Sequence, residues 1–286
     1  MKILCSLFPK LFRGISKEEL ADILKETGFE AVDLLIRDGY WVDMDNMVEG
    51  SEEFINFMNK KGIKVEFATT GFSPEMLCEN QEPLRILSEA GIKSFRMSYL
   101  FYDEEKEDFF SSLEKGRTQM QRMAELCVRF NIKAVYQIHH GSNQLIHHSM
   151  AALYVVRDLP PEYIGIMPDA GNQFFEAHEN WHRAIITLDK YMAAFGVKDG
   201  KYEYNPDEKT TESKGWKKEF APCQEGVNNW YDIIKALKKI DFDGVLNFQP
   251  FYYENEHDKL VVTLKKELSY IKNIMKHVEN ETRYCE

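Results

Sequence analysis

A short apolar run that ends in a cluster of polar side chains is the feature that most constrains the fold of this chain. The clearest example spans residues 132–143. Its apolar part suits a buried strand, whereas Gln137, His139 and His140 at its end are costly to bury without partners. Strands that are apolar along their length and polar at their carboxyl ends are typical of a barrel of parallel strands.

The same design recurs three times further along, at residues 165–172, 195–199 and 244–249. Over the whole chain, strand-like runs alternate with helix-like segments at spacings of roughly 25–45 residues, as right-handed βαβ units require. We predict eight strands, which begin near residues 2, 31, 63, 92, 132, 163, 191 and 244.

Helix signals support this alternation. Ser16 and Glu19 form a capping-box pattern that predicts a helix ending before Gly28. A second helix is predicted to begin at Ser51, and amphipathic spacing predicts a long one over residues 108–130.

Eight strand–helix pairs in 286 residues fit a closed (β/α)₈ TIM barrel. An open Rossmann sheet would need a glycine-rich turn after the first strand, and residues 8–14 do not supply one. We therefore expect a single TIM-barrel domain over residues 1–286. Its one long polar insertion, at about residues 200–226, is expected to be a loop over the carboxyl-terminal face of the barrel.

Composition narrows the classes of function. The net charge of −11 disfavours nucleic acid and anionic membranes as partners. The five cysteines are scattered without a C-x-x-C pair, which favours a reducing compartment, and neither a signal peptide nor a membrane-length apolar stretch is evident. A cytoplasmic location is therefore expected, and a homo-oligomer is left open.

Five motifs together carry a resemblance to a known family. They are Tyr-Gln-Ile-His-His-Gly at 136–141, Asp-Ala-Gly-Asn at 169–172, Val-Lys-Asp at 197–199, Pro-Cys-Gln-Glu-Gly at 222–226 and Phe-Asp-Gly at 242–244. With this order and spacing the chain resembles the xylose isomerase-like TIM-barrel superfamily, specifically its sugar phosphate isomerase/epimerase group. It looks closest to a branch with Gln-x-His after strand five. The resemblance implies a TIM barrel that acts on a small carbohydrate.

The resemblance also implies an altered metal site. Familiar members bind one divalent metal through Glu, Asp, His and Glu, which correspond here to Gln137, Asp169, Gly196 and Gln249. Only Asp169 remains as a metal ligand. Because amides supply no charge to a hard cation and cannot titrate, we do not expect tight metal binding or the usual proton-shuttling Glu pair. An unfamiliar ligand set, such as His139 with Asp169, is left open.

The candidate catalytic residues are His139, Lys198 and Asp169. His139 shares the direction of Gln137 because side chains alternate along a strand. Lys198 is expected to hold an anionic oxygen or act as an acid if burial lowers its pKa. Asp169 is expected to orient a hydroxyl or a weakly bound metal. The competing interpretation is structural: a His bonded into its loop, an Asp that caps a helix, and a solvated Lys198 beside Asp199.

The candidate substrate-binding residues are mostly amides. Hydrogen bonds to sugar hydroxyls are expected from Gln137, Asn172 and Gln249. Inward-facing charges are expected at two positions and a lid side chain at a third, namely Arg96, Glu66 and Trp216. Arg96 and Glu66 could equally form a buried ion pair beneath the site.

Three hypotheses of function follow. The first is a sugar isomerase or epimerase with an altered site. The second is a catalytically silent barrel that binds a sugar or a protein partner. The third, an endonuclease acting at abasic DNA, needs a zinc cluster and a basic surface, and this chain offers neither.

Overall fold

Nine parallel strands of the computed structural model, which describes residues 2–176, 178–253 and 256–283, form two sheets. In spatial order the first consists of β2 (Ala31–Val32), β1 (Lys2–Leu7), β11 (Asp243–Phe248) and β8 (Ala194–Val197). The second consists of β3 (Leu34–Leu35), β4 (Phe67–Thr69), β5 (Ser94–Arg96), β6 (Lys133–Gln137) and β7 (Ile164–Met167).

The two sheets join along both edges. On one side β2 and β3 are parts of one strand interrupted at Asp33, and Ala31 forms a parallel bridge to Lys64, just before β4. On the other side, parallel bridges from Ile166 to Met192 and from Asp169 to Gly196 connect β7 with β8. The strands therefore surround a common interior, which confirms the predicted TIM barrel.

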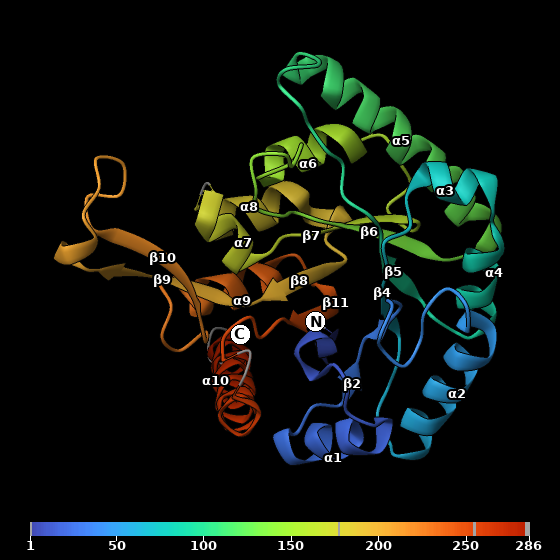
Figure 1. Ribbon diagram of the computed structural model, residues 1–286, viewed down its shortest axis with the longest axis horizontal. Coiled ribbons are helices and arrows are strands. Elements are labelled where there is room, and N and C mark those ends of the chain that lie inside the picture. The colour runs from blue at the N-terminus through green and yellow to red at the C-terminus, as the bar shows by residue number, and fades with distance from the viewer. Residues whose placement is uncertain (1, 177, 254–255, 284–286) are drawn as a thin grey trace.

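The helices lie outside this ring of strands (Figure 1). They are α1 (Lys17–Thr27), α2 (Met47–Lys60), α3 (Pro74–Glu79), α4 (Glu82–Glu89), α5 (Phe109–Phe130), α6 (Ser149–Val156), α7 (Ala170–Glu176), α8 (Trp181–Leu188), α9 (Trp230–Lys239) and α10 (His257–Arg283). The capping box of α1 is present, with the Ser16 hydroxyl accepting from the Glu19 backbone. Gly28 ends that helix in the left-handed conformation at φ 86°. In contrast to our prediction, α2 begins at Met47 rather than at Ser51, and neither α3 nor α7 was predicted.

Side-chain alternation divides the barrel interior into two layers. Lower in the barrel, apolar side chains from five strands form a small cluster, consisting of Phe67, Val135, Met167, Ala194 and Val245. Two residues further along the same strands lie the polar residues Thr69, Gln137, Asp169 and Asn247, and on β8 Gly196, beside which the Asp169 carboxylate lies. Because alternate residues share a face, the sequence places an apolar floor under a polar mouth.

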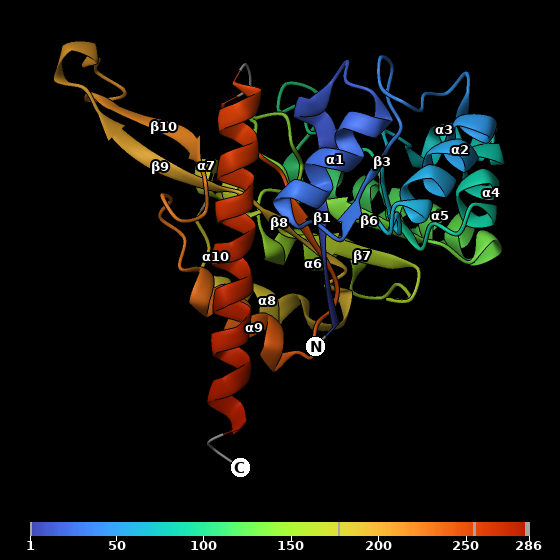
Figure 2. The same ribbon diagram turned by 90° about the horizontal axis from the view of Figure 1, so that it is seen from below.

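The expected loop insertion contains a β-hairpin. The strands β9 (Asp199–Tyr204) and β10 (Trp216–Ala221) pair antiparallel, and the hairpin projects away from the barrel (Figures 1 and 2). Its base is fixed by Asp199, whose buried carboxylate accepts hydrogen bonds from Gly200 N (2.7 Å), Asn228 Nδ2 (2.6 Å) and Trp230 Nε1 (2.8 Å). Asp199 is thus a structural anchor and not a solvated partner of Lys198.

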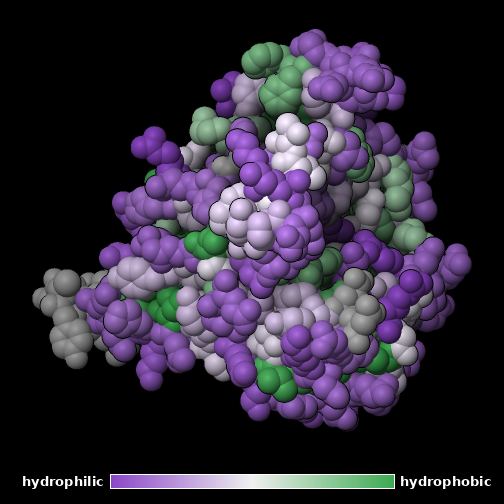
Figure 3. Space-filling model, turned by 60° about the vertical axis from the view of Figure 1, so that its left-hand side comes forward, coloured by the Kyte–Doolittle hydropathy of each residue, from purple (hydrophilic) through white to green (hydrophobic). Residues whose placement is uncertain are grey.

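The face of the molecule in Figure 3 is mostly hydrophilic, with apolar side chains in small separate groups. Within the described ranges, we find no helix whose length and apolar character would let it span a membrane.

Removing the Asp199 carboxylate should loosen the base of the hairpin. We expect Asp199→Ala to lower the free energy of unfolding by about 1–3 kcal/mol, because buried N–H donors of Asn228 and Trp230 lose their acceptor. Urea denaturation followed by circular dichroism measures this change. The matched control is Asp207→Ala, at an exposed position of the same insertion, which should change stability by less than about 0.5 kcal/mol. Equal effects of the two variants would contradict the anchoring role.

Candidate active site

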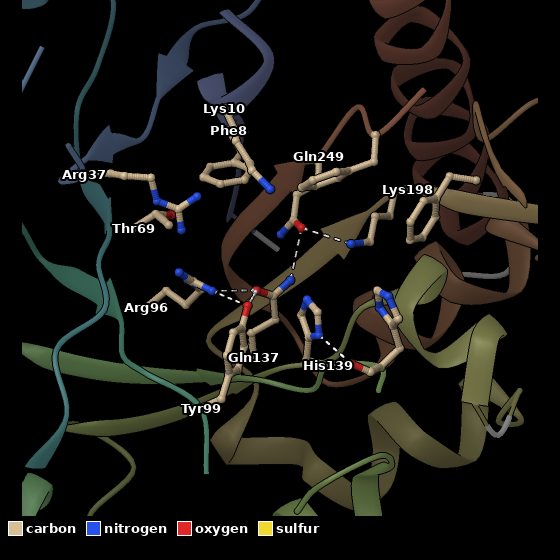
Figure 4. Close-up of a pocket in the computed structure, with 13 residues that line it drawn as sticks. Phe8, Lys10, Arg37, Thr69, Arg96, Tyr99, Gln137, His139, Lys198 and Gln249 are labelled. Atoms are coloured by element: carbon tan, nitrogen blue, oxygen red, sulfur yellow. Dashed lines mark hydrogen bonds between the residues drawn. The ribbon is translucent and has the colours of Figure 1, made fainter. Parts of the chain in front are cut away.

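A pocket of about 310 Å³ opens at the carboxyl ends of the strands (Figure 4). It is lined by Phe8, Lys10, Arg37, Thr69, Arg96, Tyr99, Gln137, His139, His140, Lys198, Phe220, Gln249 and Phe251. These residues come from strands on every side of the barrel and from the loops that follow them. The pocket lies at the strand ends where the sequence predicted a site.

Four of the sequence-predicted residues form one hydrogen-bonded group at its base. Gln137 Nε2 donates to Asp169 Oδ2 (2.7 Å) and to Gln249 Oε1 (3.1 Å). Lys198 Nζ donates to Gln249 Oε1 (3.3 Å) and lies 3.5 Å from Asp169 Oδ2. All four side chains are buried, so their polar atoms depend on one another rather than on water.

This group continues downward to a second buried carboxylate. Gln249 Nε2 donates to Asn247 Oδ1 (2.8 Å), and Asn247 Nδ2 donates to both oxygens of Asp33 (2.7 and 2.9 Å). The hydroxyls of Ser6 and Thr69 also donate to Asp33. Burial raises the pKa of Asp33 to about 6, although these hydrogen bonds oppose the shift.

Two glycines leave room for the side chains of Asp169 and Lys198. A Cβ at Gly196 would lie 2.3 Å from Asp169 Oδ2, and a Cβ at Gly171 would lie 2.5 Å from Lys198 Cγ. The Asp169 carboxylate therefore lies over β8 in space that only glycine leaves free. Position 196 is also where the family resemblance places a histidine ligand, and here that space is filled by Asp169.

The Lys198 ammonium group is buried to an extent that is unusual for a lysine side chain. It is fully buried, and its Nζ lies 5.0 Å from the ring centroid of Phe220 and 4.6 Å from that of Phe251. Burial lowers the pKa of Lys198, while Asp169 raises it. The aromatic rings retain some stabilisation of the charged form through cation–π contact.

His139 lies in the pocket, as expected from its alternation with Gln137. Its Nδ1 donates to the backbone oxygen of His140 (2.8 Å), which leaves Nε2 as the proton-accepting nitrogen. Its ring packs against those of Tyr99 and His140, each with centroids 4.6 Å away. Burial lowers the pKa of His139 to about 4, so the ring is neutral at pH 7.

Asn172 supports the site from behind instead of lining the pocket. Its backbone N–H donates to Asp169 Oδ1 (2.7 Å) and its Oδ1 accepts from His140 Nδ1 (2.8 Å). The side chain is fully buried at the start of α7. The structure thus corrects its expected contact with substrate, because the short helix after β7 turns Asn172 toward the protein interior.

Two other expected site residues lie elsewhere. Glu66 precedes β4, lines a depression at the amino-terminal end of the barrel, and pairs with Lys93 (2.8 Å). Trp216 is 54% exposed and packs on Tyr202 and Tyr204 in the hairpin. The hairpin residue that does line the pocket is Phe220, four positions further along β10.

Arg96 lines the pocket as expected and is joined by residues that the sequence analysis missed. Its guanidinium donates to the Thr70 backbone oxygen (2.9 Å), to Gln137 Oε1 (3.4 Å) and to the hydroxyl of Tyr99. The missed residues mostly follow the ends of the first four strands, as Phe8, Arg37 and Tyr99 do. Applying the strand-end rule to those strands as well would have found them.

The donor set does not fit a divalent cation. Gln137 directs its amide N–H at Asp169, and the other carboxylate oxygen accepts from the backbone of Asn172. Both oxygens of the one remaining acidic ligand are therefore occupied by N–H donors, with the Lys198 ammonium beside them. Hard cations need several anionic or neutral oxygen lone pairs. In the part of the chain that the structure describes, no group of three or more His, Cys, Asp or Glu side chains is placed to hold a metal.

Comparison with known proteins identifies the family. The family described as xylose isomerase-like TIM barrel matches residues 21–274, so the chain belongs to this family. Comparison with curated proteins gave no match.

Solved structures share the fold at low sequence identity. A D-psicose 3-epimerase with D-tagatose, from Clostridium cellulolyticum H10, is 12% identical, with a TM-score of 0.70 over 96% of this chain and 99% of that one. An L-ribulose 3-epimerase is 11% identical, with a TM-score of 0.71 over 100% and 98%. The IolI protein with a bound zinc atom is 12% identical, with a TM-score of 0.73 over 97% and 99%. At these identities the likeness shows a common fold.

The proton affinity of His139 is open to direct measurement. We expect its imidazole to titrate with a midpoint near 4 instead of the ordinary 6.5, because burial disfavours the charged ring. NMR titration of the histidine ring protons provides the midpoint, and the signal missing from a His139→Gln variant assigns it. A midpoint at or above 6.5 would show that the pocket stabilises the imidazolium.

Proposed function

We propose that this chain is an isomerase or epimerase of a small carbohydrate, working at the mouth of the barrel without a tightly bound metal. The observation that carries the proposal is the buried group of Gln137, Asp169, Lys198 and Gln249 at the base of an open pocket. The family and the fold shared with D-psicose and L-ribulose 3-epimerases support a carbohydrate ligand.

The reaction class requires a proton to leave a carbon next to a carbonyl group. Negative charge then develops on the carbonyl oxygen, and a nearby cation stabilises it. The proton returns to the opposite face of the same carbon in an epimerisation, or to the neighbouring carbon in an isomerisation. Each outcome needs one group that accepts a proton and one cation that holds the oxygen, and an epimerisation also needs that cation or another acid to donate a proton from the opposite face.

The pocket provides both kinds of group. His139 is neutral at pH 7 and presents Nε2 as an acceptor. Lys198 lies in a dry environment where its charge acts strongly on a developing oxyanion, and its lowered pKa eases proton donation. In this proposal Asp169 holds the Lys198 ammonium in place and orients a substrate hydroxyl, while Gln137 and Gln249 bind further hydroxyls.

The second hypothesis, a catalytically silent barrel, is favoured by the interlocked amides. Gln137 and Gln249 donate and accept among themselves, and neither can titrate. This hypothesis predicts saturable ligand binding without proton exchange.

Replacing Lys198 tests the proposed chemistry. Each sugar of a panel of ketoses and aldoses is incubated with the protein in D₂O and followed by NMR. Wild-type protein should introduce deuterium into the sugar that is its substrate. Lys198→Met keeps most of the side-chain volume, and we expect it to lower the exchange rate by about 100-fold or more because the oxyanion loses its cation. The control is Lys201→Met, in β9 outside the pocket, which should exchange at the wild-type rate.

Two results would contradict this assignment of roles. Unchanged exchange in a combined His139→Gln and Lys198→Met variant would show that other residues move the proton. Saturable sugar binding without exchange in the wild type would favour the silent barrel.

Metal content tests the second part of the proposal. We expect protein purified without chelator to hold far less than one metal ion per chain by elemental analysis, because N–H donors occupy the oxygens of Asp169. Exchange activity should be insensitive to EDTA. Near-stoichiometric metal that is lost in an Asp169→Ala variant would overturn this part.

A further inference from the structure

Among the residues that the structure describes, the pocket is lined by four cationic side chains and by no carboxylate. They are Lys10, Arg37, Arg96 and Lys198. Two acidic groups, Asp169 and Asp33, lie in and beneath its floor. Such a concentration of positive charge stands out in a chain whose net charge is −11. A concave positive surface in an acidic protein concentrates anions.

Arg96 is buried, and no carboxylate of the described residues forms an ion pair with it, although Asp33 is near enough to interact through charge. Its side chain is 7% exposed, and its donors reach only neutral acceptors, namely Thr70 O, Gln137 Oε1 and the hydroxyl of Tyr99. Its Nε has no hydrogen-bond acceptor among the described residues. Because a buried cation without a directly bonded counter-ion is costly, a ligand anion next to this guanidinium would be stabilised.

Arg37 places a second guanidinium at the rim of the pocket, on the same side as Arg96. Its backbone is fixed by two hydrogen bonds with Val42 and Tyr40. In the described ranges its guanidinium has neither a hydrogen bond nor an ion pair, and it is exposed at the rim. Figure 4 shows Arg37 and Arg96 on one side of the pocket, whereas Lys198 lies on the other. Guanidinium groups bind carboxylate and phosphate oxygens in paired hydrogen bonds.

The opposite wall holds a second pair of like charges. The ammonium groups of Lys10 and Lys198 lie 4.7 and 4.6 Å from the centroid of the same ring, Phe251. Each disfavours the charge of the other, and Lys10 contributes to the lowered pKa of Lys198.

We propose that the natural ligand carries an anionic group, a carboxylate or a phosphate, that binds to Arg37 and Arg96 on the side of the pocket away from Lys198. The inference rests on the proposed function for the carbohydrate part of the ligand and on the charges alone for the anionic part. The substrate class is then a sugar acid or a sugar phosphate, with its carbonyl end toward Lys198.

Binding measurements with matched sugars test the anionic group without requiring turnover. D-Glucose, D-glucuronate and D-glucose 6-phosphate share one ring, as do D-fructose and D-fructose 6-phosphate, and inorganic phosphate is the minimal probe. By calorimetry and thermal shift, we expect a charged member to bind wild-type protein at least about tenfold more tightly than its neutral parent. Inorganic phosphate should raise the melting temperature and compete with that sugar.

Arg37→Gln should weaken binding of the charged sugar about tenfold and leave the neutral parent unchanged. Arg37 is exposed, so the variant should fold normally. The control is Arg13→Gln, which removes the same charge from an exposed side chain that lies against the Tyr40 ring outside the pocket. Preference for phosphate or carboxylate in the wild type identifies the source of the anion.

Two outcomes would overturn the inference. One is that charged sugars and inorganic phosphate bind the wild-type protein no more tightly than they bind the Arg37→Gln variant. The other is that Arg13→Gln weakens binding as much as Arg37→Gln, since the effect would then be one of overall charge. Arg37-dependent binding without deuterium exchange would retain the anion site and reject the isomerase, whereas exchange into neutral sugars alone would do the reverse.

Discussion

A buried carboxylate, Asp33, determines the orientation of the polar groups above it in the barrel mouth. An ionised carboxylate only accepts hydrogen bonds, so Asn247 turns its amide N–H toward Asp33 and its oxygen toward Gln249. Gln249 must then donate downward and present its oxygen upward, where Gln137 and Lys198 donate to it. Each side chain in this series fixes the direction of the next. The group therefore has one fully satisfied arrangement, which is what a preorganised site requires.

Charge balance explains why amides suit this mouth. Carboxylates at positions 137 and 249 would join Asp169 in one buried group of three like charges, which would require a multivalent cation. With Gln at both positions one negative charge remains, and the single ammonium of Lys198 lies beside it at 3.5 Å. Gly196 and Gly171 belong to the same arrangement, because they leave the space in which Asp169 and Lys198 meet. The two amides, the two glycines and Lys198 thus together allow a single carboxylate, that of Asp169, to be buried beside a single ammonium group.

Sequence patterns predicted the barrel and much of its mouth because both depend on alternation along strands. The rule that places Val135 in the core places Gln137 above it, and it applies equally to Asp169, Lys198 and Gln249. It went wrong for Glu66 because β4 begins only at Phe67, so the strand end lies at Thr69. The predictions for Asn172 and Trp216 failed because of local structure that has no periodic signal in the sequence. These structures are the short helix α7 after β7 and the hairpin within the insertion. Arg37 and Tyr99 follow the ends of β3 and β5, where the same strand-end rule would also have placed pocket residues.

The dryness of Lys198 depends on parts of the chain far from it in sequence. Phe220 and Phe251 cover its ammonium, and both belong to segments held from behind by Glu267 of α10. The Glu267 carboxylate accepts from Cys223 N (2.8 Å) and from the Tyr252 hydroxyl (2.6 Å). Burial raises the pKa of Glu267 to about 7, so these bonds must offset a substantial desolvation cost. Since burial is the main cause of the lowered pKa of Lys198, α10 affects this pKa indirectly by holding the segments that carry the two covering rings.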